Sequence, residues 1–149
     1  MKPASAKENV ERIREFLAVV KKMKAPALIY TSKEKKPVVI REIKKAFTGR
    51  KTHFIDPSID EKEEVDRIFS ASCKEGSLLL VSLDKSSLPV VTRRLEQIME
   101  DGHIPINVSG NWRKVEPTDT WQTIVWIDAD QINETEFKLR EQFVYKLVL

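Results

Sequence analysis

Glycine and cysteine are scarce in this sequence of 149 residues, which has four glycines and one cysteine. So few glycines leave little room for the glycine-rich loops that wrap around phosphate groups. The single cysteine, Cys73, excludes an internal disulfide and any metal site built from several cysteines. Because it shares an apolar helical face with Phe69, we expect a buried structural thiol and not a nucleophile.

Long apolar runs are also missing. No segment approaches the roughly 20 apolar residues of a membrane span, and the N-terminus lacks the apolar core of a signal peptide. We therefore expect a cytoplasmic protein without a membrane partner. Charge is plentiful, since 33% of the residues are charged and 41% are hydrophobic, with a net charge of +3. This balance indicates a globular protein and permits nucleic-acid contact without requiring it, and its Lys/Glu-rich charge is typical of heat-adapted, thermophile proteins.

Helical and strand patterns alternate along the chain. Apolar residues at helical spacing follow a capping-box pair, Ser5 and Glu8, and predict a first helix that Pro26 ends. Similar capping signals precede later helices: Asp60 with Glu63, Ser86 or Ser87, and Asn133 with Glu136. Short apolar runs between the helices predict strands at 27–30, 52–55, 78–83, 123–127 and 143–149.

This alternation predicts an α/β fold, a three-layer sandwich with a mainly parallel five-stranded sheet. The unbroken apolar run from Leu78 to Leu83 is typical of a central strand covered on both faces. We expect one domain over residues 1–149, with an N-terminal helix over 1–24 and a core over 25–149. Within the core, alternating apolar residues around Ser109-Gly110-Asn111 predict an inserted β-hairpin at about 103–121.

The order of these elements, with local sequence, resembles the core of the AAA+ ATPases, the P-loop NTPase class, and within it the minichromosome maintenance (MCM) helicase branch. Leu78 to Leu83 with Asp84-Lys85 looks like the Walker B strand and the segment after it. Leu95 to Gly102 is similar to the MCM helix that leads into the pre-sensor-1 hairpin. Leu139 to Phe143 loosely matches a family stretch whose arginine, here Arg140, would reach a neighbouring subunit.

The sequence departs from this family at its catalytic motifs. Thr31 to Pro37 stands in place of the Walker A loop and contains no glycine, although its lysines could attract an anion at a helix start. Ser82-Leu83 replaces the Asp-Glu pair of Walker B. Asp128-Ala129-Asp130 replaces the sensor-1 asparagine, and the chain stops where the family continues into a lid. We therefore expect an inactive ATPase, not an enzyme, with no cofactor.

The predicted hairpin tip, Gly110 to Lys114, combines an aromatic residue with two cations. Trp112 could stack on a base while Arg113 and Lys114 pair with phosphates, and the MCM resemblance implies that the hairpin faces DNA. Alternatively, Trp112 folds back on Trp121 and the cations are only solvated. Further lysines, Lys33, Lys35 and Lys36, are candidate contacts, and the second and third helices with their turns could form one positive face. The leading hypothesis is a non-catalytic module that binds DNA or a DNA-replication partner.

Two other functions remain open. Asp84, Asp128 and Asp130 follow strand ends that meet at one sheet edge, where carboxylates could hold Mg²⁺ for a nuclease or phosphotransfer reaction. They could equally cap the helices that come next. The apolar segment from Phe143 to Leu149 could instead expose a sheet edge for self-association or for docking another protein.

Overall fold

The computed structural model describes residues 6–84, 87–128 and 141–149. In chain order its elements are α1 (Ala6–Met23), β1 (Ala27–Thr31), α2 (Lys36–Ala46), β2 (Thr52–Ile55), α3 (Lys62–Glu75), β3 (Leu78–Leu83), α4 (Pro89–Asp101), β4 (Ile104–Val108), β5 (Asn111–Val115), β6 (Gln122–Asp128) and β7 (Tyr145–Val148).

A five-stranded parallel sheet forms the centre of the molecule, with strand order β2-β3-β6-β1-β7. Strands β1, β3 and β6 lie in its middle, and their residues are buried almost without exception. The apolar run from Leu78 to Leu83 predicted this burial. The α/β fold class and the mainly parallel five-stranded sheet are therefore confirmed.

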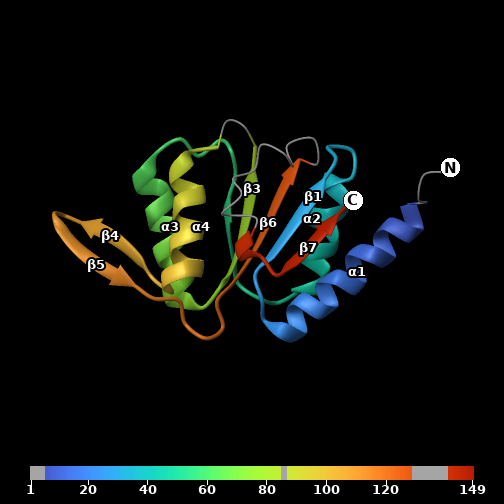
Figure 1. The fold of residues 1–149 in the computed structure, drawn as a ribbon, viewed down its shortest axis with the longest axis horizontal. Coiled ribbons are helices and arrows are strands. Elements are labelled where there is room, and N and C mark those ends of the chain that lie inside the picture. The colour runs from blue at the N-terminus through green and yellow to red at the C-terminus, as the bar shows by residue number, and fades with distance from the viewer. Residues whose placement is uncertain (1–5, 85–86, 129–140) are drawn as a thin grey trace.

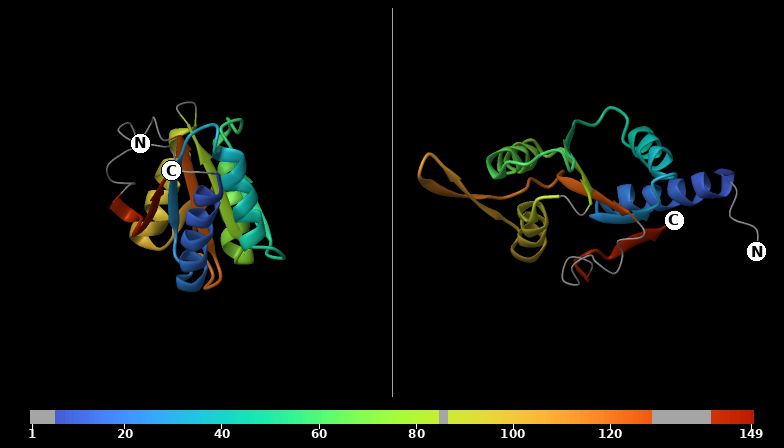
Figure 2. Two further views of the ribbon diagram at one scale, coloured as in Figure 1. Left: turned by 90° about the vertical axis from the view of Figure 1, so that its right-hand side faces the viewer. Right: turned by 90° about the horizontal axis from the view of Figure 1, so that it is seen from above.

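Helices cover both faces of the sheet in three layers (Figures 1 and 2). On one face, α1 and α2 pack against the sheet through one apolar cluster, which includes Ile13, Ile43 and Trp126. On the other face, α3 and α4 pack through a second cluster, which includes Phe69 and Leu95. The expectation that the second and third helices form one positive face is therefore wrong, because the sheet separates α2 from α3.

Some helix boundaries follow the sequence signals and some do not. Pro37 and Pro89 lie in the first turns of α2 and α4, as expected. The predicted caps of α3 and α4 are wrong: the N-cap residues are Glu61 and Leu88, and neither makes a side-chain cap hydrogen bond. The Ser87 hydroxyl instead accepts a hydrogen bond from the Asp84 amide at 2.9 Å. Ser5, Ser86, Asn133 and Glu136 lie outside the described residues.

Strands β4 and β5 form an antiparallel hairpin that does not join the main sheet. The hairpin projects from the end of the molecule opposite α1 (Figure 1). Its two-residue turn has positive φ at Ser109 (52°) and Gly110 (84°), which matches the twist of the strands. The Gly110 amide also donates to Asn107 Oδ1 at 2.9 Å. The predicted hairpin is confirmed.

The base of the hairpin is fixed to the end of α3. The Thr118 amide donates to the Cys73 carbonyl at 3.1 Å, and the Trp121 indole donates to Ser72 Oγ at 3.2 Å. Cys73 itself is fully buried, and burial raises the pKa of its thiol to about 12. Cys73 is thus an inert packing residue, as its helical face predicted. In the part of the chain described, no helix combines the length and apolarity needed to span a membrane.

Candidate nucleic-acid interface

The loop between β1 and α2, at the place of a phosphate-binding loop, is closed on itself. Ser32 accepts the amides of Lys35 and Lys36 through its carbonyl, at 3.2 and 3.0 Å, and its hydroxyl also accepts the Lys35 amide. Pro37 in the first turn of α2 has no amide hydrogen. Helix N-termini bind anions through unpaired amides, and here the amides of Lys35 and Lys36 are already paired while Pro37 has none.

Ser82 and Leu83, which the sequence resemblance sets at the Walker B position, are buried at the end of β3. Ser82 is 2% exposed, and within the described residues its hydroxyl has no hydrogen-bond partner. Leu83 is 8% exposed and belongs to the apolar cluster beneath α3 and α4. Neither side chain offers a carboxylate to a metal ion or to water.

Two of the three predicted strand-end carboxylates, Asp84 and Asp128, are described, and both lie at the expected edge of the sheet. Leu83 pairs with Ile127 and Thr31 with Asp128, so Asp84 and Asp128 share the carboxyl edge of neighbouring strands. The third acid of the predicted set, Asp130, lies outside the described residues, as does Arg140. Among the residues that are described, no group of three or more potential metal ligands comes together.

The lysines before α2 and the hairpin lie far apart. Lys33 and Lys36 border a shallow groove of about 510 Å³ beside α2, together with Ile40 and Lys44, and Lys35 precedes the helix as its N-cap. The hairpin extends from the opposite end of the molecule (Figure 2). A single short ligand therefore cannot bridge the two groups of predicted binding residues.

The tip of the hairpin differs from the predicted one. Its turn is Ser109-Gly110, and the residues from Asn111 onward already belong to β5. In the ladder, Trp112 faces Asn107 and Lys114 faces Pro105, whereas Arg113 faces Ile106. Because side chains alternate along a strand, Trp112 and Lys114 share one face of the hairpin and Arg113 lies on the other.

Trp112 is exposed and does not fold into the core. Its side chain is 65% exposed, while Trp121 is half-buried against the apolar cluster and bonded to Ser72. The alternative that Trp112 folds back on Trp121 is therefore wrong. Lys114 has an exposed ion pair with Glu116 at 3.4 Å.

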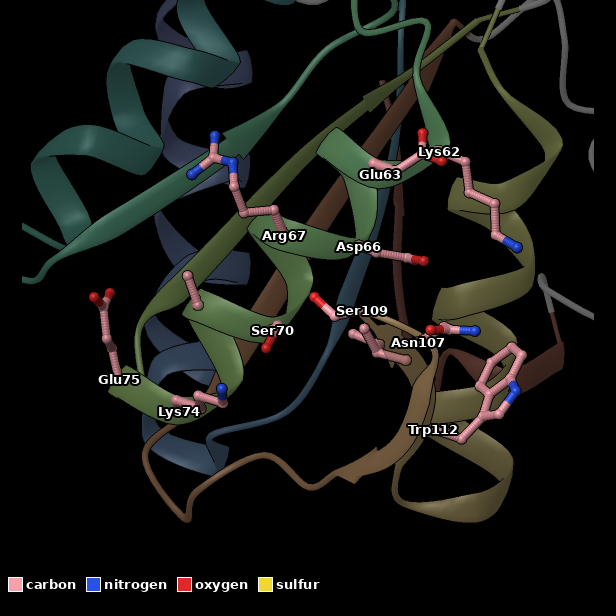
Figure 3. A pocket seen from close by; sticks show the side chains of 12 residues that line it. Lys62, Glu63, Asp66, Arg67, Ser70, Lys74, Glu75, Asn107, Ser109 and Trp112 are labelled. Carbon is pink, nitrogen blue, oxygen red and sulfur yellow. The ribbon is translucent and has the colours of Figure 1, made fainter.

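Two grooves run along the hairpin, and Trp112 borders both. The α3-side groove has a volume of about 880 Å³ and lies between the hairpin and α3. Its polar lining includes three acidic residues, three basic residues and one asparagine, among them Glu63, Arg67 and Glu75. Figure 3 shows Arg67 and Glu75 pointing away from Trp112, and Lys62 extending to the side toward which Trp112 and Asn107 point. The α4-side groove, about 370 Å³, is lined by Lys62, Pro89, Val90, Arg93, Arg94, Gln97, Pro105 and Trp112.

A buried ion pair joins the two helices beneath the hairpin. The Arg94 guanidinium donates to both carboxylate oxygens of Asp66, at 2.7 and 3.1 Å, and also to Gln97 at 2.8 Å. The two charged side chains are only 6% and 13% exposed. A bidentate pair adds geometric specificity to its energy, so this pair fixes how α3 and α4 meet below the two grooves.

Lys62, Arg93 and Pro105 were missed as candidate site residues in the sequence. Lys62 stands within the acidic run from Glu61 to Glu64, so this stretch predicts a negative surface. Arg93 lies on the outer face of α4, whereas the apolar pattern of that helix identifies only its inner face. Only Pro105 carried a usable signal, because a turn at Ser109-Gly110 sets it opposite Lys114.

Comparison with known proteins gives the fold. No family model and no curated protein matches the chain. Among solved structures, a mutant of RuvB from Thermotoga maritima matches with a TM-score of 0.67 and 16% identity over 100% of this chain and 49% of that chain. NtrX from Brucella abortus in complex with ATP matches with a TM-score of 0.66 and 11% identity over 99% of this chain and 36% of that one.

A further structure of Thermotoga maritima RuvB, described as a Holliday junction branch migration motor, matches with a TM-score of 0.63 and 17% identity over 99% and 48% of the two chains. The fold is therefore that of the AAA+ P-loop ATPases, as the resemblance implied. The chain spans about half or less of the length of these structures.

Proposed function

We propose that this chain is an AAA+-like domain without ATPase activity that binds nucleic acid through its projecting hairpin. The observation that carries the proposal is Trp112, a large aromatic side chain that is 65% exposed on a two-stranded arm. Exposed aromatic rings beside cations are the usual platform for nucleobases. The resemblance of the segment before the hairpin to the MCM branch also supports a contact with DNA.

The closed loop before α2 supports the absence of ATPase activity. A phosphate-binding loop presents several free amides, a lysine and a hydroxyl to the phosphates and Mg²⁺. Here Ser32 occupies the amides of Lys35 and Lys36. Ser82 and Leu83, both buried, supply no acid to orient Mg²⁺ or the attacking water.

The other predicted contact residues have secondary roles beside Trp112. Lys33, Lys35 and Lys36 lie across the molecule from the hairpin and would meet only a long nucleic acid. Arg140 would serve a contact between subunits, as the family resemblance implies. Lys114 and Arg113 add positive charge to opposite faces of the arm.

Binding to labelled DNA at low salt tests the proposal. We expect fluorescence anisotropy to report binding by the wild type, and at least a fivefold loss in Trp112→Ala, because stacking contributes about 1–3 kcal/mol per base. Val144→Ser is the matched control, because Val144 is an exposed apolar residue far from the hairpin, at 83% exposure. The absence of binding to both single- and double-stranded DNA would contradict the proposal.

The proximity of Asp84 and Asp128 supports one competing function, a metal-dependent nuclease or phosphotransfer domain. That function requires Mg²⁺ or Mn²⁺ to bind at the sheet edge. Calorimetric titration distinguishes the two functions: heat of binding that disappears in Asp128→Ala would favour the metal site. A domain that binds only through its hairpin gives no such heat.

A further inference from the structure

The two grooves beside Trp112 differ in charge. The α3-side groove has Glu63, Asp66 and Glu75 in its lining, so a phosphate there would meet carboxylates. None of the residues that line the α4-side groove is acidic, and its cations are Lys62, Arg93 and Arg94. An anionic ligand that lies against Trp112 is therefore favoured on the α4 side.

Two of these three cations are available to a ligand. Arg94 is buried, and its charge is balanced by Asp66. Lys62 and Arg93 are exposed, and neither forms an ion pair within the part of the chain described. Lys62 extends from the first turn of α3 toward the side that Trp112 occupies (Figure 3), while Arg93 belongs to α4. The two charges thus approach the groove from different helices.

Apart from Gln97, the remaining lining residues of the α4-side groove are apolar. Pro89, Val90 and Pro105 line it together with Trp112, and Pro105 shares the Trp112 face of the hairpin. Its volume, about 370 Å³, lies at the small end of the about 300–1,000 Å³ typical of ligand sites. Such a site suits one planar ring with its attached phosphates and not the width of a duplex.

From these observations, and resting on the proposed function, we infer that the α4-side groove takes one unpaired nucleotide of a single strand. Its base stacks on Trp112 beside Pro105, and its flanking phosphates pair with Lys62 and Arg93. Bases inside a duplex are already stacked and their faces are covered, so a ring such as Trp112 selects single strands. The Asp66–Arg94 pair acts as a positioning element below the groove.

Anisotropy titrations with a fluorescent oligothymidylate and with a duplex of the same length test this inference in the whole chain. We expect the single strand to bind at least fivefold more tightly than the duplex. Lys62→Ala and Arg93→Ala should each weaken single-strand binding at least threefold and lower the slope of log K against log salt by about 0.7. Trp112→Leu should weaken it about fivefold or more, and Trp112→Phe should keep most of the affinity.

Two variants serve as matched controls. Arg67→Ala removes an exposed cation that borders the α3-side groove and pairs with Glu64, and Lys22→Ala removes one from the last turn of α1, on the other face of the sheet. Both should bind the single strand within twofold of wild type. Circular dichroism of each variant confirms that the fold is kept.

The outcomes separate the groove from the general function. If Trp112→Leu weakens binding but the duplex binds as well as the single strand, or Lys62→Ala and Arg93→Ala bind like wild type, the nucleotide groove is wrong while the hairpin function stands. If Arg67→Ala has the largest effect, the ligand lies on the α3 side and the inference is overturned. If neither nucleic acid binds, the proposed function and the inference both fail.

Discussion

Gly76 shows at the scale of one residue how the hairpin is held to the body. It ends α3 with φ of +64°, and a Cβ there would overlap the hydroxyls of Thr118 and Thr120. Thr120 Oγ1 donates to the Gly76 carbonyl at 3.0 Å. A side chain at Gly76 would therefore separate the end of α3 from the segment that comes after the hairpin.

We predict that Gly76→Ala lowers the free energy of unfolding by about 2–4 kcal/mol, because alanine would have to adopt a left-handed backbone and its Cβ would also overlap the two hydroxyls. Gly102→Ala is the matched control: Gly102 ends α4 with φ of +74°, and a Cβ there would meet nothing within 4 Å. Gly102→Ala should lower the free energy of unfolding by only about 1 kcal/mol, which is the cost of the left-handed backbone alone. Urea unfolding of both variants measures the difference, and equal losses would show that the hairpin base does not pack on Gly76.

At the scale of elements, the Asp66–Arg94 pair joins α3 to α4 over 28 residues of sequence. Removing one partner of a buried pair leaves the other charge without compensation. We predict that Asp66→Ala lowers the free energy of unfolding by about 3 kcal/mol. The value is at the low end of the range for buried pairs because Gln97 remains an acceptor for Arg94.

The double variant Asp66→Leu with Arg94→Met separates charge from packing. An apolar pair of similar volume often replaces a buried ion pair without loss, so the double variant should recover most of the stability. Urea unfolding again gives the measurement. A double variant as unstable as Asp66→Ala would mean that the hydrogen-bond geometry, and not the lone buried charge, holds the two helices together.

The hairpin illustrates what a sequence pattern can specify at this scale. Ser109-Gly110 is a strong turn signal, and the alternation of Ile104 and Ile106 fixes which residues face inward. The same alternation separates Arg113 from Trp112, so the aromatic ring and its two neighbouring cations do not form one mixed tip. Of the residues that line the α4-side groove, Lys62 and Arg93 could not be predicted, because they meet the hairpin only through the packing of two helices.

At the scale of the molecule, the fold could be predicted because local signals agreed with one another. The apolar run of β3, the prolines that open α2 and α4, and the regular alternation of helix and strand all favour the same parallel sheet. The predicted N-cap residues were wrong. Asp60 and Ser87 have the side chains typical of N-caps, but Glu61 and Leu88 are the N-cap residues of α3 and α4. The chain path around Asp56 and Asp84 is set by tight turns, in which side chains bond locally and not to a helix end.

The loop before α2 leads to a prediction for the whole domain. A ligand that binds only the folded state raises the free energy of unfolding. ATP at about 100 times its dissociation constant would raise it by about 2.7 kcal/mol. For a domain of this size that would raise the melting temperature by about 5–10 °C. We expect a rise of less than about 1 °C with MgATP, because Ser32 occupies the amides of Lys35 and Lys36 and Pro37 has no amide hydrogen to offer a phosphate.

Differential scanning fluorimetry with and without MgATP measures this shift. A rise of several degrees would contradict the closed loop, and variants would then locate the nucleotide. Loss of the rise in Lys36→Ala, beside the loop, would assign it to the place of the Walker A motif. Loss in Trp112→Leu alone would instead mean that the adenine stacks on the hairpin, so the domain would recognise nucleotides by stacking without any phosphate-binding loop.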